Sequence, residues 1–193
     1  SHVDVAEMVS LLQRVQPNVL VSVGRIENDL QLARGLANSG PSIGAVAVVA
    51  TPIQQFQDAL GDDVEGFVGP SQWEPGLDNP EDYGPSSREV LESLRRRGHP
   101  YPDYPIVQAY AAGLVAQRCV EDAGTLKNAA LREMAGALEF STFYGRFKID
   151  SATGCQIGRS VVIVQWQGGR KVVVWPQERS QGQLQYPWRG TGL

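Results

Sequence analysis

Histidine, cysteine and methionine are scarce in this sequence of 193 residues, with two of each. A serine or cysteine hydrolase triad would have to use His99, which stands beside Pro100 in a predicted loop, and no GxSxG elbow exists. A zinc site needs three or four nitrogen or sulfur ligands, and the chain assembles no convincing set. Cys119 and Cys155 leave both free thiols and a disulfide open. We therefore expect no catalytic residue, no metal and no cofactor, and predict that the protein is not an enzyme.

An excess of positive charge and a long apolar run are also missing. Seventeen Lys and Arg against 21 Asp and Glu give a net charge of -4 and a pI of about 5.2, which argues against a nucleic-acid partner. The one basic run, Arg95 to Arg97, ends a predicted helix, where positive charge complements the helix dipole. No stretch approaches the ~18 apolar residues that cross a bilayer. With 42% apolar residues, the chain is too hydrophobic for a disordered protein.

The first 70 residues alternate between helical and strand patterns. Apolar residues recur at helical spacing after Asp4 and again over 27–39. Thr51-Pro52 predicts a short helix with proline at its first position, ending at Gly61. Continuous apolar runs predict buried strands over 18–23, 43–50 and 64–68. Strands without polar alternation are typical of a parallel sheet with helices on both faces, so the fold class is predicted to be α/β.

The remainder changes character twice. Four prolines between Pro70 and Pro85 indicate a loop or a crossing between lobes. Helices are then predicted from the Ser86 capping box to Arg97, over 106–123, and on to about Leu138. After that the period becomes two, with a strand over 143–150 and a C-terminal β-hairpin in which 161–166 and 171–175 flank Gly168-Gly169. In the tail, Tyr186-Pro187-Trp188 could dock on the sheet.

Several of these segments together resemble one protein family. They are Pro102-Asp103-Tyr104 before the longest helix, Tyr144-Gly145-Arg146-Phe147 with Asp150 and Gly154, and Val164-Gln165-Trp166 followed by Val174-Trp175-Pro176. In order and spacing they resemble the C-terminal half of ABC-transporter periplasmic substrate-binding proteins of the leucine/isoleucine/valine-binding, type I family. The resemblance implies two α/β lobes that close on a ligand, with the chain crossing between them three times.

The resemblance also implies a division of this chain between the lobes. Residues 1–77 would be a portion of the C-terminal lobe, residues 78–156 a portion of the N-terminal lobe, and residues 157–193 the hairpin returning to the C-terminal lobe, with the tail. The family is roughly twice as long, so the chain is expected to be a fragment, a truncated product or one half completed by a companion segment. A missing half-sheet exposes apolar surface, which favours a homo-oligomer.

Ligands of open α/β sheets bind beyond the carboxyl ends of the strands, and three such ends can be named. Arg25 follows the first strand and could pair with a ligand carboxylate. Thr51 follows the second and could form one hydrogen bond. Gln72 and Trp73 follow the third, where the indole could stack on a ligand, and Tyr101 is a further aromatic candidate. The structural alternatives are an exposed arginine, a threonine N-cap and a tryptophan packed under the crossing.

The family suggests both a function and a question about the ligand. It implies a periplasmic or extracellular solute-binding protein, with or without a lipid anchor, that delivers a small amino acid, such as a branched-chain one, or a carboxylic acid to an ABC permease. Amino-acid binders of this type place an aromatic residue near Arg25 and a carboxylate near Thr51. Because this sequence departs from both, a carboxylate without an ammonium group fits at least as well. The alternatives are a ligand-sensing domain of a receptor or regulator and, third, an enzyme.

Overall fold

A computed structural model describes residues 4–39, 43–77 and 79–188. The chain forms two compact units, the first made of Ser1–Ser71 with Val162–Leu193 and the second of Gln72–Val161. The chain therefore leaves the first unit after Ser71 and returns to it at Val162. The assignment of 1–77, 78–156 and 157–193 to two family lobes stays a prediction.

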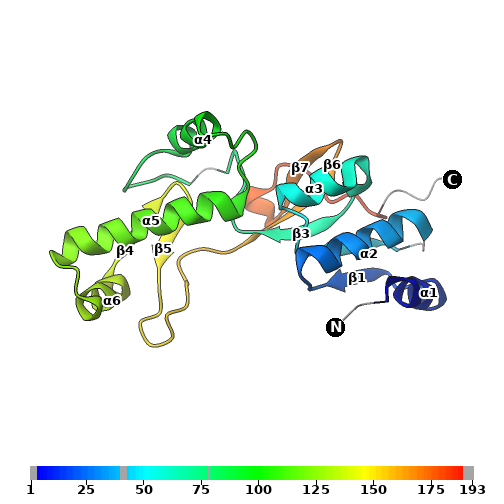
Figure 1. The fold of residues 1–193 in the computed structure, drawn as a ribbon, viewed down its shortest axis with the longest axis horizontal. Helices are drawn as coiled ribbons and strands as arrows, with labels where there is room; N and C mark the ends of the chain where they lie inside the picture. Colours follow the sequence, from blue (N-terminus) through cyan, green and yellow to red (C-terminus); the bar gives the residue numbers. More distant parts are fainter. Residues whose placement is uncertain (1–3, 40–42, 78, 189–193) are drawn as a thin grey trace. The chain divides into compact units, whose positions relative to one another are not determined.

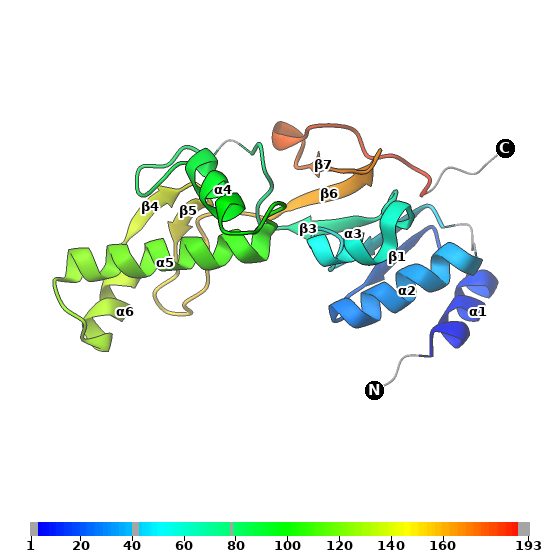
Figure 2. The ribbon, with the colours of Figure 1, turned by 45° about the horizontal axis from the view of Figure 1, so that its top comes forward.

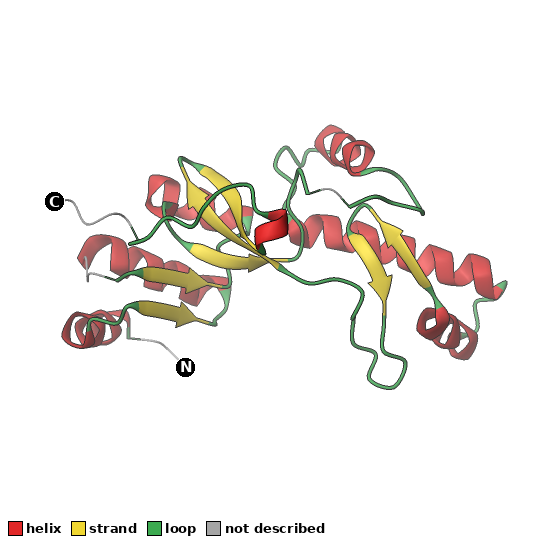
Figure 3. Cartoon of the chain, turned by 180° about the vertical axis from the view of Figure 1, so that it is seen from behind, coloured by secondary structure: helices red, strands yellow, loops and turns green. Residues whose placement is uncertain are grey.

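The first unit is built on a mixed five-stranded sheet (Figure 1). Its order is β1-β2-β3-β6-β7, with the strands β1 (Val19–Ser22), β2 (Ala45–Val48), β3 (Val68–Ser71), β6 (Val162–Gln167) and β7 (Arg170–Trp175). The strands β1, β2 and β3 are parallel, and their arrowheads point the same way in Figure 3. The strands β6 and β7 then run antiparallel. The predicted α/β class is confirmed, and the returning hairpin makes the sheet mixed.

Three helices of the first unit pack beside one another along the sheet, namely α1 (Val5–Val15), α2 (Ile26–Ser39) and α3 (Gln54–Leu60). A short 3₁₀ turn, η1 (Gly61–Val64), follows α3. Proline was predicted at the first position of α3, but the N-cap is Ile53. The reason is a turn before the helix, closed by the Ile53 amide donating to the Ala50 carbonyl at 3.0 Å.

The predictions for the first and third strands need correction. The third was expected over 64–68, but the Phe67 amide bonds the Val64 carbonyl at 3.1 Å, so this stretch turns and β3 starts at Val68. The first was expected to be buried, but among the described strands β1 lies at an edge of the sheet and pairs with β2 alone. As a result Val19 and Val21 are 57% and 66% exposed, while Leu20, on the other face, packs against the core.

The C-terminal hairpin and tail complete the first unit. Gly168 and Gly169 have φ of 59° and 72°, the left-handed pair that a two-residue hairpin turn needs. The Glu65 carboxylate accepts from both of their amides, at 2.6 and 3.2 Å. After η2 (Gln177–Arg179) the tail returns to the sheet, where the Trp188 ring lies edge-on to Phe67 with centroids 5.2 Å apart. The predicted docking of the tail is thus observed at Trp188.

The second unit combines three helices with a two-stranded sheet (Figure 2). The helices are α4 (Ser87–Arg96), α5 (Tyr104–Ala123) and α6 (Asn128–Ala137), and the strands are β4 (Glu139–Thr142) and β5 (Gly145–Lys148). Ser86 and Glu89 form the predicted capping box at α4. Gly124 ends α5 with φ 61°. The core contains Trp73, Val90, Val107, Leu114 and Phe143.

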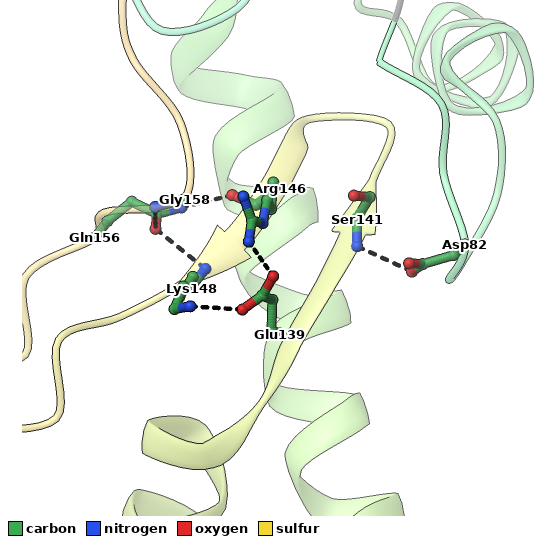
Figure 4. Close-up of polar contacts among 7 residues, drawn as sticks. All are labelled: Asp82, Glu139, Ser141, Arg146, Lys148, Gln156 and Gly158. Atoms are coloured by element: carbon green, nitrogen blue, oxygen red, sulfur yellow. Dashed lines mark hydrogen bonds and ion pairs between the residues drawn. The ribbon is translucent and has the colours of Figure 1, made fainter.

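The β4–β5 hairpin was not predicted, because 143–150 reads as one strand. Phe143 and Tyr144 instead form the turn, and their rings are buried in the core of this unit. Polar contacts then tie the strands together (Figure 4), with Glu139 paired to Lys148 at 2.7 Å and to Arg146. The apolar turn is explained by burial: these two aromatic side chains face helices rather than solvent.

Two further expectations concern the cysteines and the membrane. Both thiols are free, and burial raises the pKa of Cys119 whereas Cys155 is exposed. Within the described ranges, no helix has the length and apolar character that crossing a bilayer requires.

Candidate ligand-binding site

The strands β1, β2 and β3 are parallel, so their carboxyl ends lie at the same edge of the first unit's sheet. Arg25 follows β1 and Thr51 follows β2, so these two predicted residues lie at the same edge. A solvent-open hollow begins here, lined by Met8, Ser22, Val23, Gly24, Arg25, Asn28 and Leu32. This is the position at which doubly wound sheets bind ligands.

Arg25 is held by its backbone and presents its side chain to solvent. Its carbonyl accepts from the amides of Asn28 and Asp29, both at 3.0 Å, and so begins α2. The residue is exposed, and among the described residues its guanidinium takes part in no ion pair. A guanidinium offers paired N–H donors that match a carboxylate.

Thr51 is fully buried, and its polar groups serve the fold. The hydroxyl donates to the Val68 carbonyl at 2.9 Å, and the Thr51 carbonyl accepts from the Trp166 indole at 2.9 Å. Gly69 lies directly against this side chain, since a Cβ there would stand 2.6 Å from the Thr51 Cβ. Thr51 therefore joins the loop after β2 to β3 and β6.

Asp29 lies in the first turn of α2, just after Arg25, and was missed by sequence reasoning. Its carboxylate is 0% exposed and accepts from the Ala50 amide at 2.9 Å and from the Ser22 hydroxyl at 3.3 Å. Burial raises the pKa of Asp29, and these hydrogen bonds oppose the rise. The available signal was helical spacing, because Asp29 shares the face of Ala33 and Leu36, which points into the core.

The other predicted residues, Gln72, Trp73 and Tyr101, belong to the second unit. The Trp73 indole is fully buried, donates to the Phe143 carbonyl at 3.2 Å and stacks edge-on to that ring. Tyr101 lies in the loop before α5 and is 71% exposed. Trp73 thus anchors the core of this unit, while Tyr101 offers its ring to solvent.

Gln72 is connected to Arg159, a second residue that sequence reasoning missed. The guanidinium of Arg159 donates to the Gln72 carbonyl at 3.1 Å and to its side-chain oxygen at 3.4 Å. It also stacks on the Tyr144 ring, 4.1 Å from the centroid. A small, mostly apolar hollow opens beside them, lined by Gln108, Ala111, Ala112, Val115, Thr142, Tyr144, Gly145, Phe147, Gln156 and Arg159.

Solved structures resemble this fold over most of the chain. A leucine-binding protein from Thermotoga maritima has a TM-score of 0.73 and 17% identity, covering 88% of this chain and 47% of that one. A solute-binding protein from R. palustris in complex with benzoate has a TM-score of 0.71 and 18% identity, covering 90% and 46%. A leucine-, isoleucine-, valine-, threonine- and alanine-binding protein from Brucella ovis, in a closed conformation, has a TM-score of 0.71 and 14% identity, covering 96% of this chain and 45% of that one.

The chain spans about half the length of these structures, and at such identities the likeness establishes the type I fold alone. No curated protein matches the sequence. The model of one protein family, described as periplasmic binding protein, matches residues 1–171. Since the match covers most of the 193 residues, the chain belongs to the periplasmic binding protein family.

Proposed function

We propose that this chain is part of a solute-binding protein of an ABC importer. It captures a small carboxylate between two lobes and delivers it to a membrane permease, from a periplasmic or extracellular location with or without a lipid anchor. Membership of the family and the likeness to structures of leucine- and benzoate-binding proteins support this proposal. The binding role is a matter of recognition and closure, so no catalytic group is required.

Arg25 is the observation that carries the proposal. It is an exposed guanidinium at the carboxyl edge of parallel strands, beside an open hollow. Its charge is available to a ligand carboxylate, because no ion pair of the described residues uses it. We expect Gln72 and Tyr101 to contribute a polar and an aromatic contact, while Thr51 and Trp73 act by shaping the walls.

The ligand we favour is a carboxylic acid without an ammonium group. At the position after β2 the chain has Val49-Ala50-Thr51, which offers no carboxylate to an ammonium. The solute-binding protein from R. palustris, whose fold this chain resembles, was solved in complex with benzoate. An aromatic or aliphatic acid would place its carboxylate on Arg25 and its apolar part in the hollow.

The test uses four probes that share size but differ in head group. Benzoate, benzyl alcohol, benzylamine and leucine are titrated into the chain, and the shift in melting temperature is followed. Benzoate should stabilise most, and Arg25→Gln should remove that shift. The matched control, Arg170→Gln, makes the same charge change at the exposed first residue of β7 in the same unit and should leave the shift intact. Equal stabilisation by benzyl alcohol, or an intact shift in Arg25→Gln, would contradict the assignment.

A ligand-sensing domain of the same fold is the second candidate. Capture of a ligand by lobe closure serves both roles, so a sensing domain would bind the same ligand. It would pass the signal to a receptor or regulator instead of delivering the ligand to a permease. Binding of the liganded protein to permease-containing membrane vesicles separates the two, since only the importer component should bind them.

A further inference from the structure

We propose that Asp29 is a positioning residue for ligand binding, whose buried carboxylate joins the loops that follow β1 and β2 and thereby holds Arg25 at the binding edge. This inference rests on the proposed function, because it concerns the same edge of the sheet. It assigns a role to a residue that does not itself contact the ligand.

The first step is the set of bonds that Asp29 makes. From the first turn of α2, its Oδ2 accepts from the Ala50 amide at 2.9 Å, and its Oδ1 accepts from the Ser22 hydroxyl at 3.3 Å. One carboxylate therefore joins the end of β1, the start of α2 and the loop after β2. Hydrogen bonds to an ionised acceptor are stronger than neutral ones, so three segments are tied at one point.

The second step concerns the backbone that carries Arg25. The Asp29 amide donates to the Arg25 carbonyl at 3.0 Å. The neighbouring Gly24 lies so close that a Cβ there would stand 3.1 Å from the Asp29 Oδ1. The chain is therefore held on both sides of Arg25. After Arg25, the Asp29 amide donates a hydrogen bond to the Arg25 carbonyl, and before it, Gly24 packs against the Asp29 carboxylate.

The third step is the consequence of removing the acceptor. Ala50 is buried, so without Asp29 its amide would lose its partner away from water, which chains strongly avoid. The loop after β2 would then have to move to find another acceptor. Because the same carboxylate supports the loop of Arg25, the backbone that carries the Arg25 side chain would lose its fixed position as well.

The arrangement also bears on the class of ligand. Both Asp29 oxygens are engaged within the fold and the side chain is 0% exposed, so its carboxylate is not offered to a ligand ammonium. The residue that it positions is a cation. An edge organised in this way suits a carboxylate that lacks an ammonium group.

Three variants of the 193-residue chain test the role. Asp29→Ala removes the acceptor, while Asp29→Asn retains a carbonyl that can accept from Ala50 and an amide that can donate to Ser22. Val46→Ala opens the fully buried core of β2 away from the edge and serves as a destabilised control. Benzoate affinity is measured by calorimetry, and exchange of the Ala50 amide by NMR.

We expect Asp29→Ala to bind benzoate about tenfold or more weakly and to exchange its Ala50 amide faster. Asp29→Asn should rescue both, and Val46→Ala should lower the melting temperature while leaving affinity unchanged. Loss of affinity in Val46→Ala to the same degree, or an unchanged Ala50 amide in Asp29→Ala, would overturn the inference. If the wild-type chain binds none of the probes, the proposed function fails and the positioning role of Asp29 falls with it. If the wild-type chain binds benzoate and Asp29→Ala binds it with the same affinity, only the positioning role of Asp29 is refuted.

Discussion

Replacing Gln165 by methionine should detach the C-terminal tail from the sheet of the first unit. Gln165 lies on β6 and is 1% exposed, although its side chain is an amide. Its nitrogen donates to the carbonyls of Gly66 and Gln185 at 3.1 and 3.0 Å, and its oxygen accepts from the Gln185 amide at 2.8 Å and from Gln167 at 2.7 Å. Methionine preserves the volume and removes all four bonds.

The loss of unfolding free energy depends on which of the groups that lose a partner can bond water in the variant. Gly66 is buried, so its carbonyl loses a partner at a cost of about 1–3 kcal/mol. Gln185 is exposed, so its two backbone groups can turn to water, and each lost bond costs about 0.5–1.5 kcal/mol. These three bonds together are worth about 2–6 kcal/mol. The fourth bond adds little, because the Gln167 side chain is partly solvated and can turn to water.

Urea unfolding followed by tryptophan fluorescence measures the change, and hydrogen exchange of the segment 183–188 reports release of the tail. The control is Gln55→Met, which makes the same substitution at an exposed position of α3. We expect Gln165→Met to lower the unfolding midpoint and deprotect the tail, with Gln55→Met close to wild type. If Gln165→Met stays within about 0.5 kcal/mol of wild type, the reasoning from buried amide bonds is refuted.

Two further predictions concern the surface. No other described strand pairs with the outer side of β1, and Val19 and Val21 are exposed on this edge strand. The chain should therefore associate reversibly in sedimentation velocity, and Val21→Lys should abolish the association. A wild type that is monomeric at every concentration would contradict this prediction. Hydrogen bonds from Lys148 and then Arg146 lower the pKa of Glu139, so they stabilise the second unit at neutral pH and the effect is lost as the pH falls through that lowered pKa. Glu139→Gln should flatten this acid limb of the melting temperature, and an unchanged profile would argue against the pair.

The elements that could be predicted are those with local signals. The capping box at Ser86, the left-handed Gly124 and the turn at Gly168-Gly169 all depend on neighbours within a few residues. The apolar periods of α1 and α2 depend likewise on local spacing. Such features were therefore recognised with their correct type, and their bounds differ from expectation by a few residues at most.

Two of the errors occurred where a contact between distant segments decides the structure. Phe143 and Tyr144 resemble strand residues, but their burial against the helices of the second unit turns the chain there. The apolar run of β1 resembles a buried strand, but its position at the edge of the sheet exposes Val21. Neither outcome can be read from a window of neighbouring residues, since the partner that decides it lies far along the chain.

The candidate ligand-binding site was likewise predicted only in part. Arg25 and Thr51 were expected there because parallel strands place their carboxyl ends together, and both lie at that edge. Sequence reasoning missed Asp29, whose carboxylate accepts from the Ala50 amide, and it missed that the Thr51 hydroxyl donates to the Val68 carbonyl within the fold. A carboxylate that accepts from an amide 21 positions away leaves no local pattern beyond its helical face.

The α/β class and the order of the elements in the first 70 residues could be predicted from the sequence alone, because hydrophobic period, caps and turn glycines act locally. The family was recognised separately, from the order and spacing of its motifs. The tertiary structure was needed to show that β1 lies at an edge of the sheet, that Phe143 and Tyr144 form a turn, and that the polar groups of Asp29 and Thr51 are hydrogen-bonded within the fold. Those outcomes depend on burial and on hydrogen bonds between distant segments, and a buried polar group must find its partner wherever the fold brings one.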